Sequence, residues 1–271
     1  MLAGSIMWRC YVFLAIVTLA VQLPVTSARA GEDGAPQRRA EWVQIASPAG
    51  RSLKTYVVRP VDVAPTRAVV IVHENRGLTT WELEIADRLA DAGHLAIAPD
   101  MLSESGPDRG GSASFDSTAA ARDAIHGLQS DAILVDLDAV VEYANTIRVA
   151  TDGVVVVGFC WGGGQVFRYA AHNTQLAAAV VFYGPAPNEE LLKQVSAPVY
   201  GFYGEQDVPI SADVPKIKSR MKTFAKNYQP EVFAGARHGF MRSGALPDAG
   251  PADRKAHDEA WVRFAQLLAA P

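Results

Sequence analysis

The sequence predicts an α/β fold in which a mostly parallel central sheet is covered by helices on both faces. Continuous apolar runs at Ala68 to His73 and Leu95 to Pro99 are typical of parallel strands buried on both faces. Stretches with apolar residues at helical spacing, such as Thr80 to Ala92 and Ser130 to Arg148, alternate with the strands. The alternation continues to the end of the chain without a linker, so we expect residues 41–271 to form a single domain.

The remaining elements follow from the same patterns. Two alternating stretches at 42–46 and 53–59 predict an antiparallel hairpin at an edge of the sheet. Residues 103–118 are rich in Ser, Gly and Asp and predict a loop. Further strands are expected at 154–158, 176–183, 199–203 and 231–233, and further helices at 162–171, 213–227 and 253–269.

Residues 1–30 are expected to be a signal peptide and not part of the fold. Tyr11 to Leu23 is almost entirely apolar but shorter than the about 20 residues of a transmembrane helix. Ala28-Arg29-Ala30 fits the small-residue pattern of a cleavage site, and this favours cleavage after Ala30 over an uncleaved anchor. We therefore expect a periplasmic or secreted protein without a stable membrane span, and a flexible segment at residues 31–40.

Composition excludes several classes of protein. The chain has 271 residues, is 49% hydrophobic and 20% charged, and has a formal net charge of −4. It has no basic stripe, so we expect no nucleic-acid partner. The sequence has no H-x-x-x-H pattern or carboxylate–histidine cluster, so we expect no metal or other cofactor. We also expect a monomer.

The strongest sign of chemistry is the segment Gly158-Phe159-Cys160-Trp161-Gly162. It follows an apolar strand and precedes a helix, which is the context of a nucleophile elbow with cysteine in place of serine. Flanking glycines allow the sharp turn, because side chains there would clash. The other cysteine, Cys10, lies in the expected signal peptide, so no intramolecular disulfide is expected. We predict that Cys160 is the nucleophile.

Two later residues complete a predicted catalytic triad. Asp207 follows the strand expected at 199–203, and His238 lies in a loop before the closing helix. The order nucleophile, acid, histidine is that of the α/β-hydrolase fold. We expect His238 to take the thiol proton and Asp207 to orient and stabilise the imidazolium.

A fourth segment, His73-Glu74-Asn75-Arg76-Gly77, ends an inner strand. An α/β-hydrolase places its second oxyanion donor in this loop. We therefore expect the backbone N–H of Trp161 to be the first donor and that of Asn75 to be the second. A carboxylate at Glu74 would compete with His238 for the thiol proton, unless Glu74 is only an ion-paired surface acid.

With these segments, the sequence resembles the dienelactone hydrolase family over roughly Trp42 to Leu268. The resemblance rests on His73-Glu74-Asn75-Arg76-Gly77, Ala98-Pro99-Asp100, the elbow extended to Gly163, Asp207 and His238-Gly239-Phe240. It implies hydrolysis of a lactone that carries a carboxylate, with Cys160, His238 and Asp207 matching the family's triad. It also implies that Glu74 engages the resting cysteine and is displaced by substrate.

The resemblance further implies two arginines that bind the substrate carboxylate. Arg242 matches one of them by position, four residues after His238. After Pro99-Asp100, where the family has the other, this sequence reads Met101-Leu102-Ser103-Glu104, and Arg109 in the following loop is the candidate. The natural substrate could therefore be a different ester.

Three functions stay open at this point. The first is hydrolysis of a small-molecule carboxylic ester or lactone through a thioester acyl-enzyme. The second is hydrolysis of another acyl bond, a peptide or a thioester, by the same triad with a different pocket. The third is a non-catalytic periplasmic binding or redox-sensing protein, which would need neither Asp207 nor an oxyanion loop.

Overall fold

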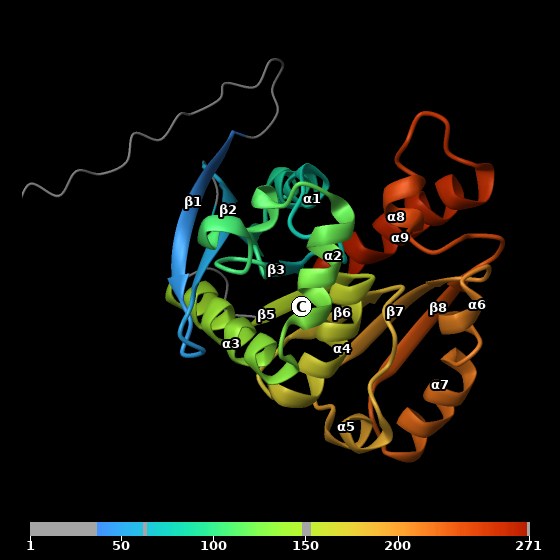
Figure 1. The fold of residues 1–271 in the computed structure, drawn as a ribbon. Helices are drawn as coiled ribbons and strands as arrows, with labels where there is room; N and C mark the ends of the chain where they lie inside the picture. The colour runs from blue at the N-terminus through green and yellow to red at the C-terminus, as the bar shows by residue number, and fades with distance from the viewer. Residues whose placement is uncertain (1–36, 62–63, 148–152, 270–271) are drawn as a thin grey trace, which may run out of the picture.

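A computed structural model describes residues 37–61, 64–147 and 153–269 of the chain (Figure 1). The strands are β1 (Arg38–Ala46), β2 (Ser52–Pro60), β3 (Ala68–Val72), β4 (Leu95–Pro99), β5 (Val154–Phe159), β6 (Ala178–Phe182), β7 (Val199–Gly204) and β8 (Tyr228–Phe233). The α-helices are α1 (Thr80–Asp91), α2 (Thr118–Gly127), α3 (Ser130–Thr146), α4 (Trp161–His172), α5 (Glu189–Gln194), α6 (Val208–Ser211), α7 (Val214–Thr223), α8 (Phe240–Ser243) and α9 (Pro251–Ala269). Two 3-10 helices, η1 (Pro107–Arg109) and η2 (Ser112–Ser114), lie in the loop after β4.

The strands form one mostly parallel sheet. Its order is β1-β2-β4-β3-β5-β6-β7-β8, and every pair from β4 to β8 is parallel. β1 and β2 form the predicted antiparallel hairpin at one edge, and β2 is antiparallel to β4. This architecture confirms the predicted α/β-hydrolase fold.

The prediction that residues 31–40 are flexible is wrong for its last three residues. β1 begins at Arg38, and residues 38–40 pair with residues 58–60 of β2. The Arg38 guanidinium also donates to Asp91 at 2.7 and 2.8 Å and to Asp87 at 3.2 Å, and both carboxylates lie on α1. Because of these bonds, β1 begins before residue 42, where the apolar pattern of the sequence predicted the strand to start. Residues 31–36 and the expected signal peptide lie outside the described residues.

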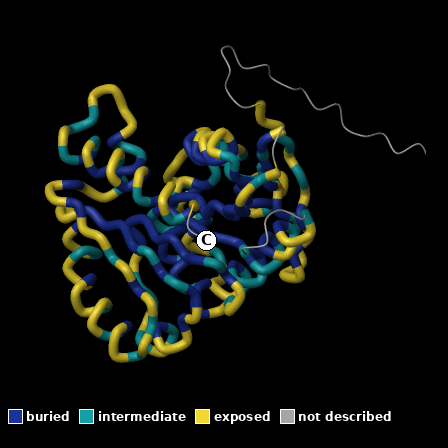
Figure 2. The backbone as a smooth tube through the Cα atoms, turned by 180° about the vertical axis from the view of Figure 1, so that it is seen from behind, coloured by how far each residue is buried: buried dark blue, intermediate teal, exposed yellow. Residues whose placement is uncertain are grey.

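Helices cover both faces of the sheet, as the continuous apolar strands predicted (Figure 1). On one face α1 and α9 pack through Trp81, Ile85, Leu89, Trp261 and Phe264. On the other face α3, α4, α5 and α7 contribute apolar side chains to a second cluster. The strands between these layers are the most buried part of the chain (Figure 2).

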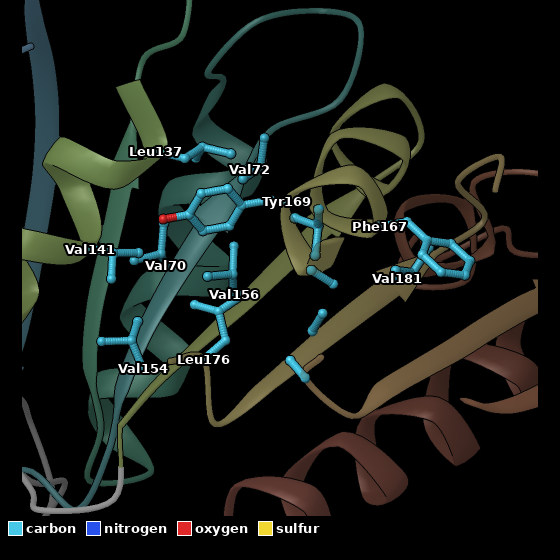
Figure 3. Packing of buried hydrophobic residues seen from close by; sticks show 14 of the residues in the cluster. Val70, Val72, Leu137, Val141, Val154, Val156, Phe167, Tyr169, Leu176 and Val181 are labelled. Carbon is cyan, nitrogen blue, oxygen red and sulfur yellow. The ribbon is translucent and has the colours of Figure 1, made fainter. Parts of the chain in front are cut away.

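The core under α3 and α4 holds the central strands in place. Figure 3 shows Val70 and Val72 of β3 facing Leu137 of α3 and Tyr169 of α4. All four residues are fully buried. Burying an aliphatic side chain of this size stabilises the fold by about 1.5–3 kcal/mol. Because these strands are fixed along their length, the loops at their carboxyl ends have rigid supports.

Helix α2 has no counterpart among the expected elements. The segment between the predicted loop and Ser130 forms this helix, with its buried residues Ala121 and Ile125 packed against Leu102. Ser117 starts the helix, since its side chain accepts a hydrogen bond from the backbone N–H of Ala120 at 3.1 Å. Across the described parts of the chain, no helix is both long and apolar enough to cross a membrane.

Candidate active site

The segment around Cys160 forms a strained turn between β5 and α4. Cys160 has φ 55° and ψ −116°, a positive φ that a residue with a side chain rarely adopts. Its backbone N–H donates to the carbonyl of Phe182 at 3.0 Å, and its carbonyl accepts from Gly164 at 3.1 Å. Strain of this kind persists only where the surrounding structure enforces it. The predicted elbow geometry is therefore present at Cys160.

Two glycines make the turn possible because backbone passes very close to them. A Cβ on Gly158 would lie 2.3 Å from the carbonyl oxygen of Gly162. A Cβ on Gly162 would lie 2.4 Å from the carbonyl oxygens of both Val72 and His73. Helix α4 can thus start directly beside the end of β3 only when both positions are glycine.

Asp207 and His238 meet at the carboxyl ends of β7 and β8. The Nδ1 atom of His238 lies 2.6 Å from Oδ2 of Asp207, and the Asp207 side chain is 9% exposed. The imidazole also interacts with the side chain of Cys160, and the two residues line the same cavity. The structure therefore brings the three residues of the predicted triad close together.

These two contacts change the acidity of His238. The hydrogen bond with Cys160 raises the pKa of His238, burial opposes it, and the hydrogen bond with Asp207 raises it further, to about 9. The imidazolium is therefore the favoured form at neutral pH. A protonated imidazole between a thiol sulfur and a carboxylate is the arrangement that stabilises a thiolate nucleophile.

The two expected oxyanion donors lie on segments that contact each other through His73. Trp161 is the first residue of α4, so its backbone N–H has no partner within the helix. The ring of His73 stacks on that of Trp161 with centroids 5.5 Å apart. His73 Nε2 accepts from the backbone N–H of Met101 at 3.1 Å, which leaves Nδ1 to donate to the Glu74 carbonyl at 2.7 Å. The buried His73 thus holds the loop that carries Asn75.

Glu74 is buried and bound to residues other than Cys160. Its Oε2 accepts from Nε of Arg242 at 2.8 Å, and its Oε1 accepts from the hydroxyl of Tyr183 at 3.3 Å. The ring of Tyr183 packs against His238 with centroids 5.0 Å apart, and its backbone has a φ of 41°. Tyr183 therefore links Glu74 to the histidine of the triad.

Arg242 is held by a second carboxylate as well. One of its guanidinium nitrogens donates to Glu82 at 3.1 Å, and the guanidinium lies 4.3 Å from the ring centroid of Trp81. The side chain of Glu82 is fully buried, and that of Arg242 is 22% exposed. The structure thus places Arg242 beside the predicted site, with its charge matched by two acids.

A cavity of about 430 Å³ opens over Cys160. It is lined by Glu74, Asn75, Arg76, Arg122, Cys160, His238, Gly239, Arg242, Ser243 and Leu246. The lining includes five predicted site residues, of which Cys160 and His238 are the reactive pair.

Arg109 lies away from the site, whereas Asp207 and Trp161, which are also outside the cavity lining, adjoin His238 and Cys160. The Arg109 side chain is 77% exposed, and its guanidinium pairs with Glu104 at 3.1 Å. Asp108 and Arg109 both have a left-handed backbone conformation within the tight turn of η1. The prediction that Arg109 binds substrate therefore finds no support in its position.

Sequence reasoning missed two arginines of the cavity, Arg76 and Arg122. Arg76 stands inside the segment that had been singled out for Glu74 and Asn75, so its proximity could have been foreseen. Arg122 lies on the unpredicted helix α2, far from the motifs in sequence. Among residues 37–61, 64–147 and 153–269, no group of three His, Cys, Asp or Glu side chains is arranged to hold a metal ion.

Comparisons with known proteins identify the family. The family model described as "Dienelactone hydrolase family" matches residues 53–270. A protein from Yersinia pestis named "Putative carboxymethylenebutenolidase" is 30% identical over 203 residues, which cover 70% of this chain and 75% of that protein. A protein of the same name from Saccharolobus solfataricus is 26% identical over 250 residues, covering 81% of this chain and 94% of that one.

Solved structures agree with the sequence comparisons. A crystal structure described as "Putative Dienelactone Hydrolase" from Klebsiella pneumoniae matches with a TM-score of 0.75 and 26% identity, covering 86% of this chain and 99% of that one. The family match spans most of the chain and includes the elbow, Asp207 and His238. The chain therefore belongs to the dienelactone hydrolase family and is a carboxylic ester hydrolase with the α/β-hydrolase fold.

Proposed function

We propose that the protein hydrolyses a small-molecule carboxylic ester or lactone through the triad Cys160, His238 and Asp207. The observation that carries this proposal is the position of His238, which is hydrogen-bonded to Asp207 and lines the same cavity as Cys160. Cys160 stands on a strained elbow and lines the cavity, where a substrate carbonyl could approach it. No cofactor is required.

The reaction has two halves. The Cys160 thiolate attacks the carbonyl carbon, and the tetrahedral intermediate then expels the alkoxide, which takes a proton from His238. The product of this half is a thioester on Cys160. Water next attacks the thioester while His238 takes its proton, and the thiolate leaves as the carboxylic acid forms. Asp207 keeps the imidazole oriented and stabilises its charge throughout.

The backbone N–H groups of Trp161 and Asn75 are the proposed oxyanion donors. Removing one such donor in a hydrolase of this type costs about 3–4 kcal/mol of transition-state stabilisation. His73 supports both, because it stacks on Trp161 and fixes the carbonyl that precedes Asn75. The proposed gating role of Glu74 requires this carboxylate to exchange its bonds with Arg242 and Tyr183 for one with Cys160.

The other functions make different demands on the same cavity. A peptidase or thioesterase would share the triad and differ in the lining of the cavity. A redox sensor would need Cys160 but no partner for His238, so the short contact between His238 and Asp207 favours catalysis.

We also propose that the protein is exported, because residues 1–30 have the pattern of a cleaved signal peptide. N-terminal sequencing of protein recovered from the periplasm or the medium tests this proposal. A first residue at Gly31 is expected, and an intact N-terminus in the cytoplasmic fraction would contradict it.

The activity is tested with p-nitrophenyl acetate and a dienelactone, with and without iodoacetamide. We expect turnover that is lost on alkylation and that falls by about a thousandfold or more in Cys160→Ala, because removing the nucleophile of a triad costs at least this much. Circular dichroism shows whether the variant is folded. Retained hydrolysis in folded Cys160→Ala would rule out the proposed mechanism.

A further inference from the structure

We infer that Asp100 and Ser112 are positioning residues for Asn75, the proposed second oxyanion donor, because together they hold the turn that carries it. Asp100 stands in the segment Ala98-Pro99-Asp100, and the proposed reaction gives this segment no role. The inference rests on the proposed ester hydrolysis, since it concerns a donor that stabilises the tetrahedral intermediate of that reaction.

The turn that carries Asn75 is closed by a single long backbone hydrogen bond. The backbone N–H of Gly77 donates to the carbonyl of Glu74 at 3.3 Å, and Gly77 has a φ of 80°. This distance is beyond the usual range for an N–H to oxygen bond, so the bond is a weak constraint. The direction of the Asn75 N–H therefore depends on how the two ends of the turn are anchored.

The entry to the turn is anchored by the residue that follows Asp100. The backbone N–H of Met101 donates to Nε2 of His73 at 3.1 Å, and Nδ1 of His73 donates to the Glu74 carbonyl at 2.7 Å. His73 is fully buried, and hydrogen bonds are stronger where water is excluded. The start of the loop after β4 thus fixes the carbonyl that precedes Asn75.

The exit from the turn is anchored by Ser112 of the 3-10 helix η2. The Ser112 hydroxyl accepts from the backbone N–H of Leu78, the residue directly after the turn, at 2.8 Å. The serine packs closely against the turn, since a Cβ on Gly77 would lie 2.3 Å from its Oγ. Ser112 therefore determines where the chain leaves the turn.

Asp100 holds Ser112 in the orientation that this contact needs. Its Oδ1 accepts from the Ser112 hydroxyl at 2.5 Å, and its Oδ2 accepts from the Ser112 backbone N–H at 2.7 Å. Oδ1 also accepts from the backbone N–H of Leu102 at 3.0 Å, and Asp100 is 5% exposed. Because the hydroxyl proton is directed to the carboxylate, the oxygen of Ser112 is left to accept from Leu78.

Both anchors start from consecutive residues at the end of β4. Asp100 acts on the exit from the turn through Ser112, and Met101 acts on the entry. Because β4 lies beside β3 in the sheet and the turn follows β3, a rigid strand end supports the turn. We expect loss of the exit anchor to move the Asn75 N–H away from the oxyanion while the triad keeps its geometry.

The test separates formation of an oxyanion from the reactivity of the thiolate. Acylation by p-nitrophenyl acetate, followed as pre-steady-state release of p-nitrophenol, moves the carbonyl π electrons onto oxygen as the Cys160 sulfur bonds to the carbon. Alkylation by iodoacetamide forms a sulfur–carbon bond and expels iodide, so no oxyanion develops.

We expect Ser112→Ala to lower the acylation rate constant by about 10- to 100-fold and to keep the alkylation rate constant within about twofold of the wild type, because only acylation needs the displaced donor. Asp100→Asn should show the same pattern. In either orientation its NH2 group faces a backbone N–H, of Leu102 or of Ser112, that the carboxylate accepts from.

A transition-state analogue gives an independent readout. Phenethyl trifluoromethyl ketone adds the Cys160 sulfur to its carbonyl carbon, and the carbonyl oxygen becomes an oxyanion like that of the tetrahedral intermediate. Its inhibition constant should rise in Ser112→Ala by about the factor by which acylation falls.

Ser114→Ala is the matched control. Ser114 lies in the same 3-10 helix and donates one hydrogen bond, to the carbonyl of Gly111 at 2.7 Å. Among the described residues it has no hydrogen bond to the turn. This variant should keep the wild-type values of acylation, alkylation and inhibition.

The outcomes distinguish this inference from the proposed function. Equal losses of acylation and alkylation in Ser112→Ala would overturn the inference, because the fault would lie in the thiolate, and so would unchanged acylation in the folded variant. Ser112→Ala removes only a hydroxyl, so it decides the question even if Asp100→Asn does not fold. Ester hydrolysis by folded Cys160→Ala would refute the mechanism itself, whatever the other variants do.

Discussion

Gly162 is the position where a single methyl group is expected to disturb the site most directly. A Cβ in Gly162→Ala would lie 2.4 Å from the carbonyl oxygens of Val72 and His73, whereas real Cβ contacts are essentially never below 3.0 Å. The obstacles are backbone atoms at the end of β3, in the middle of the sheet. Helix α4 must therefore move by about 0.6 Å or more, and Cys160 moves with it.

The size of the effect follows from this displacement. Overpacking a tight contact costs about 1–3 kcal/mol. For a domain of this size, each kcal/mol lowers the Tm by about 2–4 °C. A misplacement near 1 Å at a reacting centre lowers the rate by about a hundredfold, so we expect a loss of about 10- to 100-fold in kcat/KM.

Thermal melting and p-nitrophenyl acetate hydrolysis measure both effects. The matched control is Gly127→Ala, because a Cβ there meets nothing within 4 Å and the residue ends α2 without a positive φ. That variant should melt at or above the wild-type temperature, since alanine restricts the unfolded chain. If Gly162→Ala melted like the wild type and kept its kcat/KM, the close approach of α4 to β3 would be refuted.

Three further predictions concern the charged groups. Arg242→Met should lower the free energy of unfolding in urea by about 3–5 kcal/mol, because the buried carboxylates of Glu74 and Glu82 lose their cation, and a loss below about 1 kcal/mol would show that the two acids do not depend on Arg242. The pKa of His238 is raised to about 9, so its stabilising bonds are fully present below its ordinary value of 6.5 and are lost as the pH rises through 9. The kcat/KM should fall over the same upper range, where His238 loses the proton that it gives to the leaving group, and a rate that stays constant well above pH 9 would exclude this assignment. Asp207→Asn should lower the pKa of His238, measured by NMR titration, and reduce kcat by about 10⁴-fold, and an unshifted titration would show that the bond between the two residues does not set the acidity.

The parts of the fold that the sequence predicted are those determined by local pattern. The strands β3, β4 and β5 are continuous apolar runs, and their predicted bounds differ from the observed ones by at most one residue. Helix α2 could not be predicted in this way, because only Ala121 and Ile125 are buried and their partner Leu102 lies across a loop. Its stability depends on tertiary packing, which no local period shows.

The same distinction applies to the site. The sequence predicted that Cys160, Asp207 and His238 lie close together. The prediction rested on their order in the chain and on the predicted strand before each of them. The partners of Arg242 were hidden, because Glu82 has the sequence context of a surface acid in the first turn of a helix and lies 160 residues away. Its full burial and its bond to Arg242 depend on tertiary structure, so the ion pairs of Arg242 could not be read from the sequence.

The central claim is that Cys160 becomes acylated during turnover. The most direct measurement is rapid acid quenching during hydrolysis of p-nitrophenyl acetate, followed by mass spectrometry of the intact protein and of its peptides. We predict an increase of one acetyl group, localised to the peptide that contains Cys160, lost on treatment with hydroxylamine and absent from Cys160→Ala. An acetyl group on another residue, or hydrolysis at the wild-type rate with an unmodified Cys160, would contradict the account.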